Sequence, residues 1–466
     1  MELTYKLSNN KEWLAVTGGK DLEGNLVIPS KGVFEGNTYP VIKIEKEAFR
    51  HQLGLTSITI PESVEVIGER AFEECGNVVS VQLLSKNLRI REFAFAGCKA
   101  LKEVVFSEDG FLTIGDYAFY NCGMEEIYIP DRVAEIGEGA FASPSLRAFK
   151  TQSTYRYFTN DTKNILFLRE VHRLLIGVTP GSKSSYCEYI VKAVANAGTK
   201  EVVTLPDFVT KIEAGAFMGC QNLTGIVFHD KVTEIGERAF AECTELTHVT
   251  LPETIVSIAP RTFSWCNKLE TIVMPNVKEI SDNAWLACKS LKEIVSSVPL
   301  TLIGESAFAG CTSLTRITQR IEAKVLGEEA FDYCDKLTQI HLTDSVRKIG
   351  KECFNHCSSL ASIDIPDSVE DIDEGAFANC TSLVSINIPG SVGLIDDKAF
   401  ENCTSLETIV FSDPKNDYGI GIEVQVFAGC TSLRKIVIND ASVLEGVEIP
   451  EGVEIVRQQD STSIGQ

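Results

Sequence analysis

Residues Ser362–Leu383 read SIDIPDSVEDIDEGAFANCTSL, and near copies of this stretch recur along almost the whole chain. Each copy has an I-x-I triplet, often a proline, then V-x-x-I-G, an Ala-Phe pair and, in most copies, a cysteine three positions after the aromatic residue. Most copies are 23 residues apart. The aromatic residue occurs 15 times, at Phe49, Phe72, Phe95, Phe119, Phe141, Phe217, Phe240, Phe263, Trp285, Phe308, Phe331, Phe354, Phe377, Phe400 and Phe427.

Each part of the repeat predicts a local structure. The I-x-I triplet alternates with a period of two, which is typical of a strand with one buried face. Proline then ends the strand because it has no N–H to donate, and the glycine of V-x-x-I-G relieves the backbone at a corner. An acid three positions before the aromatic residue, present in 10 of 15 copies, suits the first turn of a short helix.

A unit of 23 residues cannot bury its own apolar face. We therefore expect the units to stack, with their strands joined in a parallel sheet and their aromatic residues in one continuous core. The predicted fold is an α/β solenoid of about 16 coils with short helical turns, each coil adding about 4.8 Å along the stack.

The repeat resembles that of the BspA-like leucine-rich repeat family, whose pattern is close to L-x-x-I-x-I-P-x-x-V-x-x-I-G-x-x-A-F-x-x-C. The likeness covers nearly the whole chain. The resemblance implies a leucine-rich repeat solenoid of a kind common on the surface of bacteria or protozoa, where members mediate adhesion to host proteins or other cells. It does not identify a particular ligand.

Breaks in the period define the predicted organisation. Residues 1–43 precede the first full unit and predict a β-rich N-terminal cap, while residues 44–150 and 205–450 hold the repeat units. Residues 151–204 lack the pattern and predict an irregular β-rich variant unit followed by a degenerate coil. Residues 451–466 predict a polar tail.

The composition excludes several classes of function. With 43 basic and 65 acidic residues, the 466-residue chain has a net charge of −22, which disfavours nucleic acid as a partner. No apolar run approaches about 18 residues, so membrane insertion is not expected. The segment Met1–Leu14 lacks the apolar region of a signal peptide.

Fifteen cysteines allow three interpretations. Metal binding would need clusters such as C-x-x-C, and the nearest approach, Cys353 and Cys357 with His356, fills core slots of the repeat. Disulfides between adjacent coils are within reach at about 4.8 Å, but such side chains would point the same way. We favour a ladder of buried free thiols, which suits a reducing compartment or an anaerobic niche.

Two regions are candidate binding sites. The middle residue of each triplet faces away from the core, and Thr318, His341, Asp364 and Asn387 form the polar section of this row. Many other positions of the row are valines, which β propensity alone explains. In the irregular segment, Tyr155 and Tyr157 either belong to a structural variant unit or project as a binding loop.

Three functions remain open. The first is a non-enzymatic binding scaffold, secreted or on the cell surface, for a protein or glycan ligand. The second is an intracellular protein–protein interaction scaffold in the cytoplasm. The third is a carbohydrate-active enzyme on a stacked β scaffold, which needs converging carboxylates, whereas the outward row offers Asp364 alone.

The acids before the aromatic residues suggest Ca²⁺ ligands, but helix-dipole preference and solubility explain them as well. We therefore predict no catalytic residue, no metal site and no cofactor, and we expect a monomer.

Overall fold

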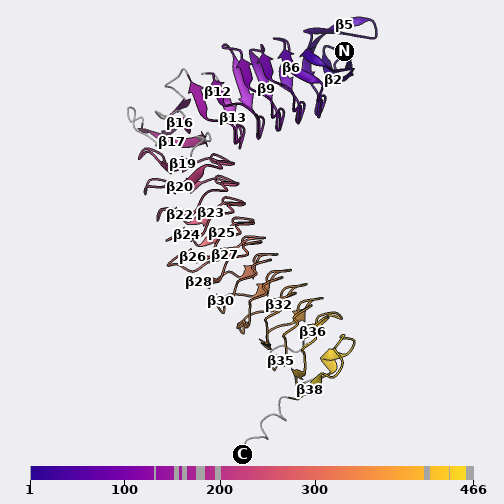
Figure 1. The fold of residues 1–466 in the computed structure, drawn as a ribbon, viewed down its shortest axis with the longest axis vertical. Coiled ribbons are helices and arrows are strands. Elements are labelled where there is room, and N and C mark those ends of the chain that lie inside the picture. The colour runs from indigo at the N-terminus through magenta and orange to yellow at the C-terminus, as the bar shows by residue number, and fades with distance from the viewer. Residues whose placement is uncertain are drawn as a thin grey trace, which may run out of the picture. The chain divides into compact units, whose positions relative to one another are not determined.

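Two compact units make up the chain in the computed structural model, which describes residues 2–130, 133–151, 157–159, 165–174, 184–194, 201–413, 420–439 and 441–457. Unit 1 comprises residues 1–201 and 206–223, and unit 2 comprises residues 202–205 and 224–466. Within each unit the repeats wind into coils whose strands lie side by side (Figure 1). The predicted stack of coils with parallel strands is therefore confirmed.

Most coils contribute two strands rather than one. The I-x-I triplet forms a triplet strand and V-x-x-I forms a shorter second strand, and each kind pairs in parallel with its counterpart in the next coil. For example, Ile58 aligns with Val81 in the triplet strands, and Ile67 aligns with Ile90 in the second strands. The V-x-x-I segment is thus a strand as well as a corner, because its isoleucine must face the core in every coil.

Unit 1 has both kinds of sheet, closed at one end by a hairpin. Its triplet strands are β3 (Gly24–Val27), β6 (Leu55–Ile60), β8 (Ser80–Leu83) and β10 (Glu103–Phe106), and separately β12 (Glu126–Ile129) with β14 (Ala148–Thr151). Its second-strand sheet runs in the order β1 (Glu2–Leu7), β2 (Leu14–Lys20), β5 (Asn37–Ile44), β7 (Val66–Ile67), β9 (Asn87–Ile90), β11 (Phe111–Ile114) and β13 (Val133–Ile136), with β4 (Lys31–Phe34) paired to β5. Because β1 is antiparallel to β2, this hairpin covers the edge of the first parallel coil.

The irregular segment adds strands to unit 1 without adding an aromatic turn. Strands β15 (Tyr157–Thr159), β16 (Ile165–Leu174) and β17 (Ser184–Val194) pair antiparallel, and β17 pairs in parallel with β19 (Lys211–Ile212). The turn before Phe141 lies directly against the turn before Phe217, since a Cβ on Gly215 would be 2.7 Å from the backbone nitrogen of Gly139. Both glycines have positive φ, and their lack of a side chain permits this close approach.

Unit 2 repeats the same arrangement over more coils. Its triplet strands are β18 (Glu201–Thr204), β20 (Leu223–Val227), β22 (His248–Thr250), β24 (Thr271–Val273), β26 (Glu293–Val295), β28 (Arg316–Ile321) and β30 (Gln339–Leu342), followed by β33 (Ser385–Ile388), β35 (Thr408–Phe411), β37 (Lys435–Val437) and β38 (Glu454–Val456). Its second strands are β21 (Glu234–Ile235), β23 (Ser257–Ile258), β25 (Glu279–Ile280), β27 (Leu302–Ile303), β29 (Val325–Leu326), β31 (Lys348–Ile349), β32 (Asp371–Ile372), β34 (Leu394–Ile395) and β36 (Gly421–Ile422). Strand β38 lies inside the segment expected to be a polar tail, and its pairing with β37 makes part of that segment a sheet edge.

The aromatic turns differ from the expected short helices. Around Phe72, both Arg70 and Glu74 have left-handed φ values, 55° and 56°, and the same two slots recur along the chain. The N–H of Phe72 donates to the carbonyl of Ala94 in the next coil at 2.7 Å. Because alternate N–H groups point along the stack, they cannot bond four residues back as in an α-helix. In the described ranges the only helix is the 3₁₀ turn η1 (Ala441–Leu444).

The core is a stack of aromatic rings, one from each regular coil. In unit 1 the ring centroids of Phe49 and Phe72 lie 5.1 Å apart with the planes 8° from parallel. In unit 2 the stack extends from Phe240 to Phe427. It includes Trp285, whose ring is parallel to that of Phe308 with the centroids 5.2 Å apart. Each such ring is buried, which stabilises the coil by about 1.5–3 kcal/mol.

Candidate binding surface

The four residues of the predicted polar row lie on the outward side of the triplet layer in unit 2. Thr318 is in β28, His341 in β30 and Asn387 in β33, and all three are exposed. Asp364 is also exposed, between two buried isoleucines, in a segment that has no assigned strand. The side chains therefore project away from the core, as the alternation of the triplets predicts.

A bulge in β28 changes the neighbours within this row. Strand β28 pairs with β30 through Arg316 and Gln339, and then resumes with Arg320 beside His341. In β28 three residues, including Thr318, stand between the inward residues Ile317 and Ile321. In β30 only His341 stands between the corresponding residues Ile340 and Leu342. His341 consequently lies beside Arg320 rather than beside Thr318. The signal was present in the sequence, because ITQRI is longer than the other triplets.

The bulge turns one polar side chain inward. Gln319 is 4% exposed, and its Nε2 donates to the backbone carbonyl of Ile294 at 3.0 Å. Its Oε1 is buried and accepts no hydrogen bond from the part of the chain that the structure describes. A bulge with a buried polar side chain disrupts a regular ladder at some energetic cost, and such features are common beside binding sites.

Toward lower residue numbers in unit 2, the outward row becomes apolar. Thr250 aligns with Val273 and Val273 with Val295 in the parallel register. Val295 is 41% exposed, and Val227 on β20 is 48% exposed. The row therefore joins an apolar section to a polar section on one surface.

Of the two tyrosines of the other predicted site, only Tyr157 lies within the described residues. Tyr155 lies outside the described residues. Tyr157 begins β15, whose backbone pairs with β16 with Tyr157 opposite Leu168. This part of the prediction stays a hypothesis.

The cysteines form the buried thiol ladder that the sequence favours. The structure describes the side chains of 14 cysteines, all except that of Cys187, and these 14 are buried and form no disulfide. The Sγ of Cys98 donates to the carbonyl of Phe72 in the preceding coil at 3.3 Å, and Cys311 does the same to Trp285 at 3.3 Å. Burial raises the pKa of Cys311 and of Cys380 to about 12. These thiols therefore stay neutral near pH 7 and are poor nucleophiles and poor metal ligands.

The three aspartates among the acids before the aromatic residues, Asp116, Asp282 and Asp397, bond to the backbone of the following coil. Asp116 Oδ1 accepts the N–H of Glu138 at 2.8 Å, and Asp282 Oδ1 accepts the N–H of Glu305 at 2.9 Å. The short-helix explanation for these acids is therefore wrong, since they link neighbouring turns instead. Within the described ranges, no three histidine, cysteine or acidic side chains come together as metal ligands.

A cluster of ionisable groups on the turns of unit 2 was missed by the sequence analysis. Asp332 Oδ1 lies 3.8 Å from Nδ1 of His356, and the His356 ring stacks on Tyr333 with centroids 4.0 Å apart. Burial, followed by the charges of Glu329 and Glu352, raises the pKa of Asp332 to about 7. The same position of the repeat holds Glu73, Tyr120 or Glu401 in other coils and alanine in several more, so the sequence does not indicate that this aspartate is half-buried.

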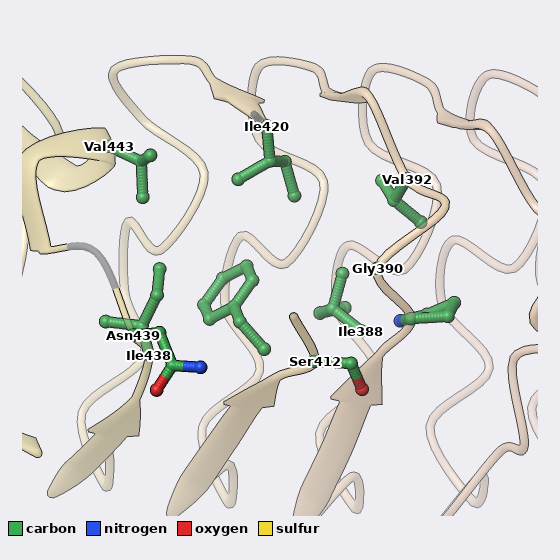
Figure 2. Close-up of a pocket in the computed structure, with 10 residues that line it drawn as sticks. Ile388, Gly390, Val392, Ser412, Ile420, Ile438, Asn439 and Val443 are labelled. Carbon is green, nitrogen blue, oxygen red and sulfur yellow. The ribbon is translucent and has the colours of Figure 1, made fainter. Parts of the chain in front are cut away.

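An apolar pocket lies where the spacing of the aromatic residues lengthens from 23 to 27 residues, between Phe400 and Phe427. Figure 2 shows Ile388, Ile420, Ile438 and Val443 around a common space. Its volume is about 20 Å³, room for one water molecule or a methyl group. The pocket is therefore a packing gap rather than a ligand site.

Comparison with known proteins gives a family match over most of the chain. The profile of the BspA type leucine-rich repeat region matches in six copies, over residues 37–162, 193–315 and 324–445. No curated protein matches the chain. Among the described residues, no helix has the length and apolar character needed to cross a membrane.

Several solved structures are similar in fold. A leucine-rich repeat protein from Bacteroides ovatus ATCC 8483 is 23% identical with a TM-score of 0.42, covering 98% of both chains. A second, from Eubacterium ventriosum ATCC 27560, is 19% identical with a TM-score of 0.48, covering 90% of this chain and 97% of its own. A leucine rich cell surface protein from Faecalibacterium prausnitzii A2-165 is 21% identical with a TM-score of 0.44, covering 73% and 93%.

Proposed function

The chain belongs to the BspA-type leucine-rich repeat family, and from this premise we propose that it is a non-enzymatic binding scaffold, secreted or displayed at a cell surface, that recognises a protein or glycan ligand. The binding surface in this proposal is the outward row of triplet strands in unit 2, with Thr318, His341, Asp364 and Asn387 as its polar section.

The observation that supports the proposal best is the change of chemistry along that row. Parallel register places Val273 and Val295 in line on β24 and β26, and the bulge then presents Arg320 and His341 on β28 and β30. An apolar patch bordered by polar and charged side chains has the composition of a protein recognition surface. The parallel ladder fixes the spacing between coils, so little conformational freedom is lost when a ligand binds.

A binding role also fits the surroundings of the row's acid better than glycoside cleavage does. Cleavage uses two carboxyl groups that face one substrate from opposite sides. In the order of the coils, Asp364 falls between His341 and Asn387, which suit hydrogen bonding to a ligand. The placement at a cell surface rests on the family resemblance.

An intracellular interaction scaffold is the second candidate, favoured by the free thiols. Disulfides persist in oxidising compartments and are rare in the cytosol. The 14 cysteines whose side chains the structure describes form no disulfide, and burial gives them an apolar role in either location. Separating the surface fraction from the cytosol of the native host, followed by detection of the protein, discriminates the two locations.

The test of the binding surface is a screen of immobilised extracellular-matrix proteins and glycans, followed by a triple variant. Thr318→Lys with His341→Lys and Asp364→Lys should abolish binding of the selected ligand and leave thermal unfolding unchanged, because all three side chains are exposed. The matched control is Glu279→Lys with Leu302→Lys and Val325→Lys, an outward row on the second strands of the same unit, and it should bind normally. Undiminished binding by the first variant would refute the site.

A further inference from the structure

A continuous groove crosses the outward face of the second-strand sheet in unit 1. It consists of three adjoining hollows of about 390, 550 and 370 Å³. The first two share Trp13, Lys43 and Glu45, and the last two share Glu65 and Val66. We call this feature the second-strand groove; it passes over β2, β5, β7, β9 and β11.

Two aromatic side chains line the second-strand groove, Trp13 where the first two hollows meet and Phe111 in the last hollow. Trp13 sits in a tight turn, in which Ser8 Oγ accepts the N–H groups of Glu12 and Trp13, both at 3.1 Å. The side chain of Phe111 is 68% exposed. Both rings are thus available to contact an apolar group of a ligand.

The position of Phe111 depends on the glycine that precedes it. Gly110 has a φ of 113°, and a Cβ there would lie 1.7 Å from the carbonyl oxygen of Lys86. Only glycine fits this crossing, so the backbone fixes Phe111 beside Asn87 of β9. An exposed phenylalanine held in this way marks the end of the groove as a contact site rather than a loose loop tip.

The charges in the groove are mixed, in contrast to the net charge of −22 for the whole chain. Five basic and four acidic side chains line it. Lys43 pairs with Glu45 at 2.8 Å and Lys46 with Glu69 at 2.9 Å. Between Trp13 and Phe111, Arg89 on β9 is exposed and makes no ion pair with any part of the chain that the structure describes.

Arg91, which directly follows β9, also lines the groove and is likewise exposed, with no ion pair in the described ranges. Its side chain lies two residues beyond Arg89, so the two guanidinium groups project on the same side of the strand. They form the part of the groove best able to accept a carboxylate through paired hydrogen bonds.

From these features we propose that the second-strand groove binds an extended peptide segment with an apolar side chain at each end and a carboxylate near its centre. Four strand steps separate Trp13 from Phe111, about 19 Å at the usual strand spacing, a length covered by about six extended residues. Four carboxylates are spread along the groove, which disfavours a nucleic acid or a sulfated glycan with negative charges along its whole length, whereas a peptide with one carboxylate can place it at the arginines. This surface is separate from the triplet row of unit 2.

The test is selection from a displayed library of random peptides of about seven residues on the full-length protein. The expected outcome is enrichment of peptides with a central acid between two apolar residues. Binding of a selected peptide, followed by fluorescence polarisation, should weaken at least about tenfold in Arg89→Glu with Arg91→Glu and in Phe111→Ser. The matched controls Lys99→Glu and Val33→Ser change exposed side chains of unit 1 outside the groove and should bind normally.

Three outcomes overturn the proposal. They are failure to enrich any peptide, enrichment of peptides without central acids, and equal binding by the arginine double variant. Thermal unfolding of each variant is measured alongside, so that a loss of binding through unfolding is recognised. The triple lysine variant of the triplet row should bind the selected peptides normally, which separates this result from the test of the proposed function.

Discussion

The inside and the outside of a coil follow opposite rules in this protein. On the inside, Phe308 is followed by Phe331 and Cys311 by Cys334, with rings 5.4 Å apart and the same thiol-to-carbonyl hydrogen bond. On the outside, Val295, Thr318 and His341 succeed one another on neighbouring coils. The comparison teaches that repetition stabilises the stack, while the outward positions are free to vary and to specify a ligand.

Of the predicted changes, alkaline pH should lower the free energy of unfolding the most. Burial holds the pKa of Cys75, Cys311 and Cys380 near 12, above their ordinary value of 9.0. Between these two values the unfolded chain releases the thiol proton and the native chain keeps it. Stability is therefore complete below about pH 9 and falls with rising pH by about 1.4 kcal/mol per unit for each thiol.

This prediction is checked by urea unfolding at a series of pH values between 8 and 11. The control is Cys311→Ala with Cys380→Ala, whose stability should fall less steeply with pH because two thiols no longer titrate. Parallel slopes for the variant and the wild type would show that these thiols are not sealed in the interior.

Removal of one ring from the aromatic stack is the next largest effect. Phe308 is fully buried between Trp285 and Phe331, so Phe308→Ala should cost about 3–5 kcal/mol. Thr318→Ala, on the exposed side of an adjacent coil, should change stability by less than about 0.5 kcal/mol. Equal shifts in the urea midpoint for the two variants would show that the inward ring contributes no more to stability than the outward threonine.

A smaller effect on stability is expected at Asp332, whose carboxyl group is half-buried next to the aromatic stack of unit 2. Its pKa of about 7 exceeds its ordinary value of 3.8, so its contribution to stability is present at acidic pH and is lost as the pH rises through 7. Asp332→Asn should therefore raise the melting temperature relative to wild type more at pH 8 than at pH 4. A shift in melting temperature of the same size at both pH values would contradict the raised pKa of Asp332.

The smallest predicted change fills the gap in the apolar pocket of Figure 2. Val392 is buried at its edge, and the pocket of about 20 Å³ accepts one additional methylene. Val392→Ile should stabilise by up to about 0.8 kcal/mol in thermal unfolding. Destabilisation would mean that the interior is already fully packed at the longer coil step.

The stack of coils can be predicted from the sequence because the residues that face the core, aromatic residues and cysteines, recur mostly every 23 residues. It does not predict the turns correctly, because an acid followed by Ala-Phe suits a helix as well as the alternating left-handed turns seen at Arg70 and Glu74. The difference lies in hydrogen bonds between coils, such as that from Phe72 to Ala94, which no single repeat contains.

The candidate sites are only partly accessible from sequence. The outward position of His341 follows from alternation, but its neighbour Arg320 depends on how the bulge in β28 resumes pairing. The second-strand groove joins Trp13, which precedes the first full repeat, and Phe111, which stands where the repeat consensus has valine. Such a surface arises from the stacking of several coils, so it becomes visible only in the folded protein.

Counting reactive thiols before and after unfolding tests most directly whether the repeated residues form a sealed interior. Fourteen cysteines, all except Cys187, have described side chains that are buried and form no disulfide. A thiol reagent should therefore leave these 14 positions unlabelled until urea unfolds the chain, when all become labelled together with their coils. Rapid labelling of Cys98 or Cys311 in the native state, or thiols still missing after unfolding because of disulfides, would contradict the account.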